Sequence, residues 1–311
     1  MSSRPEVSPV LLVQVPPPPP RIEAAAAPAG GAGPGRIVPL WKRLGIPFWL
    51  AVGWIVLVAV LAITASILPL QNPDVGNFSA LSQGPSAAHW FGTDDLGRDL
   101  MSRVIFGSRV SLIVGFAAAF LGTVIGGALG IAAGYLRSAT EGVIMLIMDA
   151  IISFPSLVML IALTTFLGKN LVNITGAIAL VTVPVLARLA RGSTLSVAKR
   201  PFILAARSAG ATNFRVMWRE IVPNVLPPLI SLGLVIVAVA IVAEGALSFL
   251  GFSIPPPTPT WGNIIASGEN DLSTAPQIVF APAAVMFVTV FAFSIAGDRL
   301  RRIGELQSGG I

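Results

Sequence analysis

RGSTLSVAKRPFILAARSAGATNFRVMWREIVPN, residues 191–224, is a basic segment that separates two long apolar runs of this chain. Its middle part, residues 200–211, predicts a short helix, which Gly210 would end in a left-handed conformation. Four small residues leave one side of that helix with little side-chain bulk: Ala205, Ala206, Ala209 and Gly210. A second amphipathic turn is predicted over residues 214–222, after which Pro223 breaks the helix before the next apolar run. The segment therefore predicts a rigid elbow with a small-residue face for docking.

The composition of the whole chain is typical of membrane proteins. Of its 311 residues, 54% are hydrophobic and 11% are charged, whereas soluble domains carry about 25% charged residues. The mean hydropathy of +0.84 agrees with this class. The chain has no cysteine and one histidine, His89, which excludes disulfides, thiolate metal sites and histidine-rich metal sites. The net charge of +6 is expected from basic loops on one side of the membrane rather than from binding to nucleic acid.

Six apolar runs are long enough to cross roughly 30 Å of hydrocarbon at a rise of about 1.5 Å per residue. They cover approximately residues 47–69, 108–135, 142–167, 172–190, 225–250 and 277–297. The fourth run is the weakest, because Pro184 interrupts it and Arg188 lies near its end. The second run carries glycines on one helix face, which predict a close helix–helix packing seam: Gly122, Gly126, Gly130 and Gly134. We therefore expect an all-α integral membrane fold with six transmembrane helices.

The basic residues predict the orientation of these spans. With six spans and the N-terminus inside, only four of the 20 Lys and Arg residues fall in outer segments: Arg98, Arg103, Arg109 and Lys169. This bias predicts that both termini are cytoplasmic. Residues 1–46 are rich in proline and alanine and are expected to form a disordered cytoplasmic tail. The membrane domain is then expected over residues 47–303, with the loop 191–223 inside, followed by a cytoplasmic tail of residues 304–311.

The basic loop resembles the coupling loop of the permeases of bacterial ABC importers. That family carries Glu-Ala-Ala, three residues, Gly, nine residues, Ile, one residue and Leu-Pro. The residues of this chain at the matching positions are Leu204, Ala205, Ala206, Gly210, Val222 and Pro223. Leu204 replaces the family's glutamate, and Glu220 and Val222 replace its isoleucine and leucine. The resemblance implies a type I ABC importer permease fold whose coupling helix docks in a groove of an ATP-binding subunit. Because Leu204 replaces the family's glutamate, the polar contact of that glutamate with the ATP-binding subunit is not expected here.

Two further segments are similar to the second permease subunit, the C type, of peptide, opine and nickel importers. Residues 91–112 read FGTDDLGRDLMSRVIFGSRVSL and match the family's G-T-D-x-x-G-R-D-x-x-S-R segment before the second span. Residues 243–268 read AEGALSFLGFSIPPPTPTWGNIIASG and match its L-S-F-L-G…P-x-W-G segment after the fifth span. The segment from Ala296 to Arg301 is similar to the family's terminal G-D-x-L-R-D, and the resemblance covers roughly residues 45–303.

The resemblance implies a multi-pass permease in the plasma membrane of a bacterium, which forms half of an import pore. A second, homologous permease would form the other half. This chain itself is expected to bind no cofactor. Two ATP-binding subunits would bind ATP and Mg. An extracytoplasmic solute-binding protein would deliver the cargo. A di- or oligopeptide is the expected cargo. Nickel or another small solute of the same family is the alternative, although the chain has no His or Cys cluster to receive a metal.

A charged cluster precedes the second span: Asp94, Asp95, Arg98, Asp99 and Arg103. Asp95, Asp99 and Arg103 are four residues apart, which predicts helical pairs, including an ion pair between Asp99 and Arg103. Two interpretations stay open: an outer gate or a contact to a binding protein, and an interfacial helix joined by its own charges. After the fifth span, a proline-rich segment is expected to form a stiff outer loop, with Trp261 as an interfacial aromatic anchor.

Two acids lie within the predicted spans and are functional candidates on that account. Asp149 lies midway along the third span, and Glu244 lies toward the outer end of the fifth. We expect each of them either to face a cargo's amino terminus in the translocation path or to pair with a neighbouring helix or subunit.

The motifs also argue against other functional classes. No phosphate-binding G-x-x-x-x-G-K-[ST] sequence occurs, so ATP hydrolysis is expected in partner subunits. No nucleophile–base pair stands out, so no catalytic residue is assigned and the chain is expected not to be an enzyme. A secondary transporter would be expected to show inverted repeats and would leave the elbow unexplained. A membrane-embedded enzyme would need a polar cluster at depth, where only Asp149 and Glu244 lie.

Overall fold

The computed structural model describes residues 40–308, so residues 1–39 of the predicted N-terminal tail and 309–311 of the C-terminal tail lie outside the described residues. The regular secondary structure of the described chain is helical, apart from one isolated β-bridge between Thr93 and Asp99. Its elements are α1 Leu40–Thr64, η1 Phe78–Ala80, α2 Leu100–Leu136, α3 Ser138–Ser153, α4 Ser156–Leu167, α5 Leu171–Val197, α6 Pro201–Ser208, α7 Asn213–Val216, η2 Met217–Ile221, α8 Val222–Phe249, α9 Trp261–Ser267 and α10 Gln277–Ser308.

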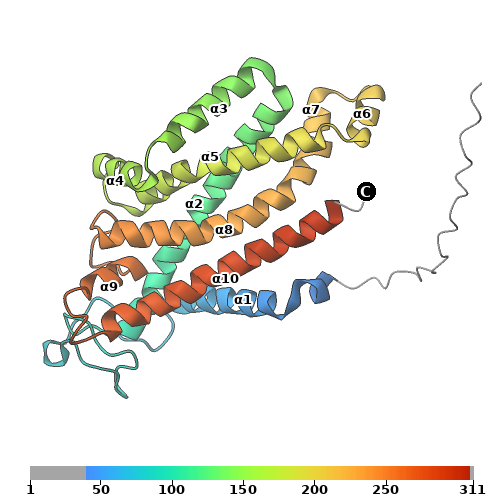
Figure 1. Cartoon of the computed structure of the whole chain (residues 1–311). Helices are drawn as coiled ribbons and strands as arrows, with labels where there is room; N and C mark the ends of the chain where they lie inside the picture. The colour runs from blue at the N-terminus through green and yellow to red at the C-terminus, as the bar shows by residue number, and fades with distance from the viewer. Residues whose placement is uncertain (1–39, 309–311) are drawn as a thin grey trace, which may run out of the picture. The chain divides into compact units, whose positions relative to one another are not determined.

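The long helices pack around α2. α2 packs along α5 and α8, α10 packs on α8, and α1 lies against α10 (Figure 1). Buried apolar side chains from α2, α5, α8 and α10 share one core: Leu112, Leu186, Leu229, Ile241 and Phe293. Trp54 of α1 donates a hydrogen bond from Nε1 to Oγ1 of Thr289 in α10, over 3.0 Å. The core therefore joins helices that are far apart in the sequence.

The predicted glycine seam packs α2 against α5, which confirms the interpretation of the glycine spacing. A Cβ atom built on Gly126 would lie 2.6 Å from the carbonyl oxygen of Val183. A Cβ atom on Gly130 would overlap the carbonyl oxygen of Ala187. The two backbones approach so closely at these positions that a larger residue would force the helices apart.

Five helical runs of the described chain are long and apolar enough to cross a membrane: α1, α2, α5, the run from α7 through α8, and α10. The predicted third span over residues 142–167 is broken in the structure. α3 and α4 are bent by 88° relative to each other, and they make a sixth span only if the bent pair is counted as one. Pro155 explains the bend, because it disfavours a helical conformation at Phe154, which is extended with φ −86° and ψ 135°.

Helix boundaries differ from the predicted spans in three places. α1 begins at Leu40, inside the predicted tail, and is kinked at Gly45, where φ is +75°. α2 begins at Leu100, eight residues before the predicted span, because Asp99 caps its first turn. α5 continues to Val197, so the first part of the predicted loop is helical.

The predicted helix break at Pro223 was wrong. α7, η2 and α8 form one helical run from Asn213 to Phe249. η2 is a π turn, in which the N–H of Val222 bonds to the carbonyl of Met217, five residues earlier. Pro223 is the second residue of α8 and follows directly after this π turn. The chain therefore enters α8 without a flexible joint.

Candidate functional site

The elbow comprises α6, α7 and the turn between them. Pro201 begins α6, a position at which its restricted φ favours a helix. α6 is followed by Gly210, whose φ of +82° is the left-handed conformation predicted from the sequence. The N–H of Gly210 bonds to the carbonyl of Arg207 over 2.9 Å, and the N–H of Ala211 bonds to that of Ala206 over 3.1 Å. These two bonds form a Schellman cap, which turns the chain sharply from α6 into α7.

Buried apolar side chains anchor the elbow to the long helices. Ile203 of α6 and Val216 of α7 are fully buried. They belong to the same core as Val197, at the end of α5, and Val225 in α8. The elbow is thus packed against both helices that it connects.

The only tyrosine of the sequence, Tyr135 near the end of α2, adds a polar anchor. Its hydroxyl donates a hydrogen bond to Oδ1 of Asn213 in α7 over 2.9 Å. The guanidinium of Arg207 in α6 lies 5.4 Å from the centre of the same ring, within range of a cation–π contact. One residue of α2 therefore contacts both helices of the elbow.

The outward side of the elbow and of η2 is exposed and partly apolar. Four large apolar side chains are more than one third exposed there: Phe202, Leu204, Phe214 and Trp218. The residues that match the coupling pattern divide into half-buried ones, Ala206 and Val222, and exposed ones, Leu204, Ala205, Gly210 and Pro223. This surface lies at the opposite end of the long helices from α9 (Figure 1). Exposed apolar groups of this kind indicate a surface for a protein partner.

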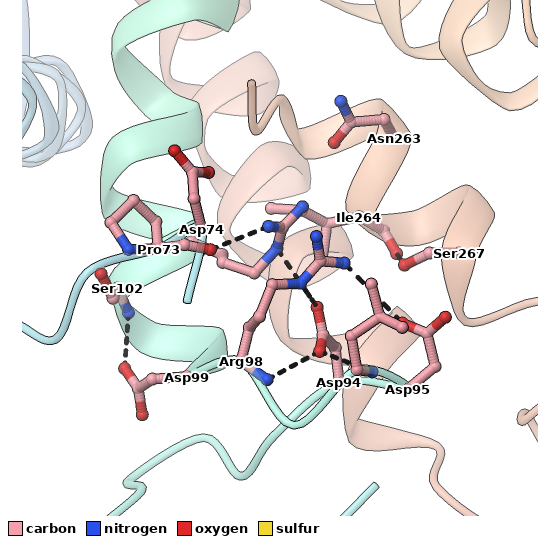
Figure 2. A network of polar contacts seen from close by, with 12 residues as sticks. Pro73, Asp74, Asp94, Asp95, Arg98, Asp99, Ser102, Asn263, Ile264 and Ser267 are labelled. Carbon is pink, nitrogen blue, oxygen red and sulfur yellow. Dashed lines mark hydrogen bonds and ion pairs between the residues drawn. The ribbon is translucent and has the colours of Figure 1, made fainter. Parts of the chain in front are cut away.

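A buried ion-pair network lies beside α9 (Figure 2). Oδ2 of Asp94 is 2.7 Å from Nε of Arg98 and 3.4 Å from Nε of Arg103. Oδ1 of Asp94 accepts hydrogen bonds from the N–H groups of Leu96, over 3.0 Å, and Arg98, over 2.9 Å. Nη1 of Arg103 donates to the carbonyl of Pro73 over 2.9 Å. One acid therefore compensates two buried guanidinium groups.

Asp99 does not pair with Arg103, contrary to the helical spacing. Residues 94–99 form a turn before α2, so the interpretation as an interfacial helix was wrong. Oδ2 of Asp99 accepts the N–H of Ser102 over 2.8 Å and caps α2. Oδ1 of Asp99 lies 3.0 Å from Nδ1 of His89, a residue for which the sequence suggested no role.

Asp95 lies at the edge of the network and is only partly compensated. Nη2 of Arg98 lies 3.8 Å from its Oδ1, and this oxygen has no hydrogen-bond partner among the described residues. Burial and the neighbouring charge of Asp94 raise the pKa of the Asp95 carboxyl above its ordinary value. The folded turn therefore binds a proton on Asp95 more tightly than the unfolded chain does.

Glu244 of α8 is 1% exposed and is surrounded by hydroxyl groups. Ser248 and Ser253 donate to its Oε1 over 2.8 and 2.9 Å, and Ser111 of α2 donates to its Oε2 over 3.3 Å. Oγ1 of Thr260 lies 3.2 Å from Oγ of Ser248. The carboxyl group thus joins α2, α8 and the segment that leads into α9. In this conformation the side chain is enclosed by protein rather than open to solvent.

Trp261 is fully buried, so its expected role as an interfacial anchor was wrong. Its Nε1 donates to the carbonyl of Val104 over 3.0 Å, and its backbone N–H donates to Oγ of Ser111 over 3.3 Å. Both acceptors belong to α2. The tryptophan therefore holds the start of α9 against α2.

Sequence reasoning did not predict α9, which begins at Trp261. A helix of seven residues is too short to show helical periodicity in the sequence. The local signal for this helix is its capping box. The side chain of Thr260 accepts the N–H of Asn263, and the side chain of Asn263 accepts the N–H of Thr260. Gly262 lets α9 approach α8 closely, since a Cβ atom there would lie 2.7 Å from Cα of Gly245.

Asp149 of α3 pairs with Arg188 of α5. Nη2 of Arg188 donates to Oδ1 of Asp149 over 2.6 Å, and the two side chains are 50% and 59% exposed. Between the same helices, Nε of Arg191 donates to Oε1 of Glu141 over 2.7 Å. An unpaired charge at the centre of a bilayer costs about 2.5–3.5 kcal/mol, which explains why Asp149 has a basic partner. The pairing of Arg188 with Asp149 was not predicted, because the two residues are 39 apart in the sequence.

A family model described as "Binding-protein-dependent transport system inner membrane component" matches residues 126–305. This range contains the elbow and both acids of the predicted spans. The chain belongs to this family. It is thus an ABC importer permease, as the coupling loop suggested.

This permease has close curated relatives. It is 38% identical over 249 residues to the glutathione transport system permease protein GsiD of Escherichia coli O6:K15:H31 (strain 536 / UPEC), covering 80% of this chain and 82% of the relative. It is 34% identical over 247 residues to GsiD of Pectobacterium atrosepticum, covering 79% and 82%. The permease therefore shares most of its length with each relative.

A solved structure supports the fold of the permease. The inward-facing MetNI methionine ABC transporter matches with a TM-score of 0.55 at 18% identity, over 66% of this permease and 97% of that chain. The expected all-α, type I ABC importer permease fold is confirmed. The described residues hold no group of three or more His, Cys, Asp or Glu side chains that could bind a metal ion.

Proposed function

We propose that this permease forms half of the pore of an ATP-driven importer of short peptides, and that the elbow is the lever on which an ATP-binding subunit docks. The curated relatives named above belong to glutathione transport systems, and glutathione is a tripeptide, which supports a short peptide as cargo. A second, homologous permease completes the pore, and an extracytoplasmic solute-binding protein delivers the peptide. ATP and Mg are bound by two partner subunits, and this chain is not an enzyme.

The connection between the elbow and two long helices carries this proposal. Three residues separate α5 from α6, and α7 continues through η2 into α8. Ile203 and Val216 bury the elbow in the core that both long helices share. A force on α6 is therefore transmitted to α5 and α8, whereas a flexible loop would absorb the displacement.

Alternating access follows from this linkage. When ATP draws the two ATP-binding subunits together, each displaces the elbow seated in its groove, and the pore switches from inward-facing to outward-facing. ATP hydrolysis separates the subunits and resets the pore. The docking surface is formed by Leu204, Ala205, Ala206 and Gly210, with the exposed aromatic side chains beside them.

The proposed orientation places the elbow and both termini in the bacterial cytoplasm. Basic residues gather at the elbow end of the long helices: Arg191, Arg200, Arg207, Arg215 and Arg219. Such residues are enriched in cytoplasmic loops. The Asp94 network and α9 then face outward, where the solute-binding protein approaches, and membrane lipid surrounds the apolar helix surfaces.

Two elbow variants test the docking role. Gly210→Val strains the left-handed cap, and Ala209→Arg adds a bulky charge to the exposed small-residue side. We expect both to reduce recovery of ATP-binding subunits with the affinity-purified permease at least fivefold and to abolish peptide-stimulated ATP hydrolysis. Gly53→Val, in an open helical position of α1, and Ala139→Arg, in an exposed position of α3, are the matched controls.

The controls should co-purify with ATP-binding subunits as the wild type does. If the elbow variants also assemble and hydrolyse ATP normally, the lever role is overturned. If no ATP-binding subunit accompanies the wild-type permease and uptake proceeds without ATP, the chain acts as a secondary transporter and the proposed function fails.

A further inference from the structure

The Asp149–Arg188 ion pair joins the second half of α3 to the interior of α5. Asp149 is eleven residues beyond Ser138, the start of α3, which is roughly 16 Å at 1.5 Å per residue. Arg188 is nine residues before Val197, the end of α5, which is roughly 14 Å. Both side chains are nevertheless at least half exposed on the surface of the subunit.

Exposed charges at this depth face water or protein rather than lipid. The contrast with other surfaces of the same subunit supports this placement. Large exposed side chains in the middle of α1 and α10 are apolar: Val56, Leu57, Val60, Phe287 and Phe291. The side shared by α3 and α5 also exposes apolar side chains, such as Leu146 and Val185. Among them it carries two ion pairs, Asp149–Arg188 and, toward the elbow, Glu141–Arg191. The α3–α5 side is therefore the one suited to an aqueous path.

The ion pair retains hydrogen-bonding capacity for a ligand. Only Nη2 of Arg188 and Oδ1 of Asp149 bond to each other, so the remaining guanidinium N–H groups and Oδ2 have no hydrogen-bond partner among the described residues. A guanidinium binds a carboxylate with two parallel hydrogen bonds, and a carboxylate accepts hydrogen bonds from an ammonium group. A short peptide carries both complementary groups at its ends.

We infer that Asp149 and Arg188 line the translocation path and contact the charged ends of the cargo, Arg188 its carboxylate and Asp149 its ammonium group. This inference rests on the proposed function, because it requires a zwitterionic peptide. As the peptide passes, the two side chains exchange their mutual hydrogen bond for bonds to the cargo. Neither the protein charges nor the peptide ends are then left without partners inside the membrane.

Single cysteines test whether this side meets water, because the natural chain contains no cysteine. Ala150→Cys is exposed beside Asp149, and Val60→Cys is exposed on α1. Each is placed in the assembled importer in membrane vesicles and treated with a charged methanethiosulfonate reagent. We expect Ala150→Cys to react at least tenfold faster than Val60→Cys. Equal or slower reaction at Ala150→Cys would overturn the placement in an aqueous path.

A double variant separates cargo contact from a purely structural role. Asp149→Asn/Arg188→Gln removes both charges and leaves neither unpaired. Glu141→Gln/Arg191→Gln is the matched control, because it removes the other ion pair between the same helices. In proteoliposomes with all partner subunits, uptake of trialanine or glutathione should fall at least tenfold in the first variant and stay within twofold of wild type in the second. Assembly and Tm should be unchanged in both.

The single variant Arg188→Gln tests the assignment of the carboxylate. The ratio of uptake of a peptide to uptake of its C-terminal amide should fall at least fivefold relative to the wild type. The solute-binding protein is the same in both assays, so its own preference cancels. An unchanged ratio, or normal uptake by the double variant Asp149→Asn/Arg188→Gln, overturns the inference while the proposed function stands. If the wild type takes up neither peptide, the proposed function itself fails.

Discussion

Oδ2 of Asp94 lies 2.7 Å from Nε of Arg98, and both side chains are buried. The two residues are four apart in the sequence, in a turn rather than in a helix. The backbone N–H of Arg98 also donates a hydrogen bond to Oδ1 of Asp94. Oδ2 of the same carboxylate also lies 3.4 Å from Nε of Arg103. Asp94 is therefore the acid that lies near both buried guanidinium groups.

Replacing Asp94 should strongly destabilise this turn. Asp94→Asn or Asp94→Ala leaves two buried guanidinium groups without their main counter-charge, which costs about 3–5 kcal/mol in the free energy of unfolding. Unfolding of the purified protein in mixed micelles measures the loss. Glu269→Gln is the control, because this acid is exposed and lies outside the network, and its effect should stay within about 0.5 kcal/mol. Similar values for the two sites would contradict the central role of Asp94.

Asp95→Asn should stabilise the protein at neutral pH. The pKa of Asp95 is raised in the folded state, so the fold binds the proton more tightly than the unfolded chain does. Its contribution to stability therefore falls as the pH rises from the ordinary pKa of 3.8 through the raised value. Tm measured from pH 3 to pH 8 should show a gain for the variant at neutral pH that vanishes below pH 3.8. A variant that is less stable at neutral pH would contradict this sign.

Gly130→Val should force α2 away from α5. The added side chain would overlap the Ala187 carbonyl, and overpacking of this kind costs about 1–3 kcal/mol. Gly53→Val, in a helical position with open space around it, should change stability little. Thermal unfolding of the two variants in detergent measures the difference. A larger loss of Tm in Gly130→Val supports the packing seam. An equal loss of Tm in both variants would show a general intolerance of valine in the helices.

Glu244→Leu should be more damaging than Glu244→Gln. Leucine accepts no hydrogen bond, so Ser111, Ser248 and Ser253 lose their acceptor in a buried site, at about 1–3 kcal/mol for each group left unsatisfied. The amide oxygen of glutamine still accepts from these hydroxyls. Comparing Tm and protease sensitivity near α9 measures the difference. Equal stability of the wild type and Glu244→Leu would show that the hydroxyl cage does not hold α9.

Several features were predictable because they depend on residues that are neighbours in the sequence. Long apolar runs predict membrane helices, since lipid offers no hydrogen bonds and the backbone must satisfy its own. Glycines four residues apart predicted the seam on α2, and Gly210 predicted the left-handed end of α6. The break at Pro155 was equally local, but it was missed because hydropathy does not detect a bend within an apolar run.

The sequence by itself therefore determined the membrane class, most of the spans, the elbow and the family to which the permease belongs. Only the tertiary structure decided that Arg103 meets Asp94 rather than Asp99, that Arg188 meets Asp149, and that hydroxyls enclose Glu244. The physical reason is distance along the chain. Arg188 and Asp149 are 39 residues apart, and Ser111 and Glu244 are 133 apart. Such partners are chosen by how helices pack and bend, which local periodicity does not encode.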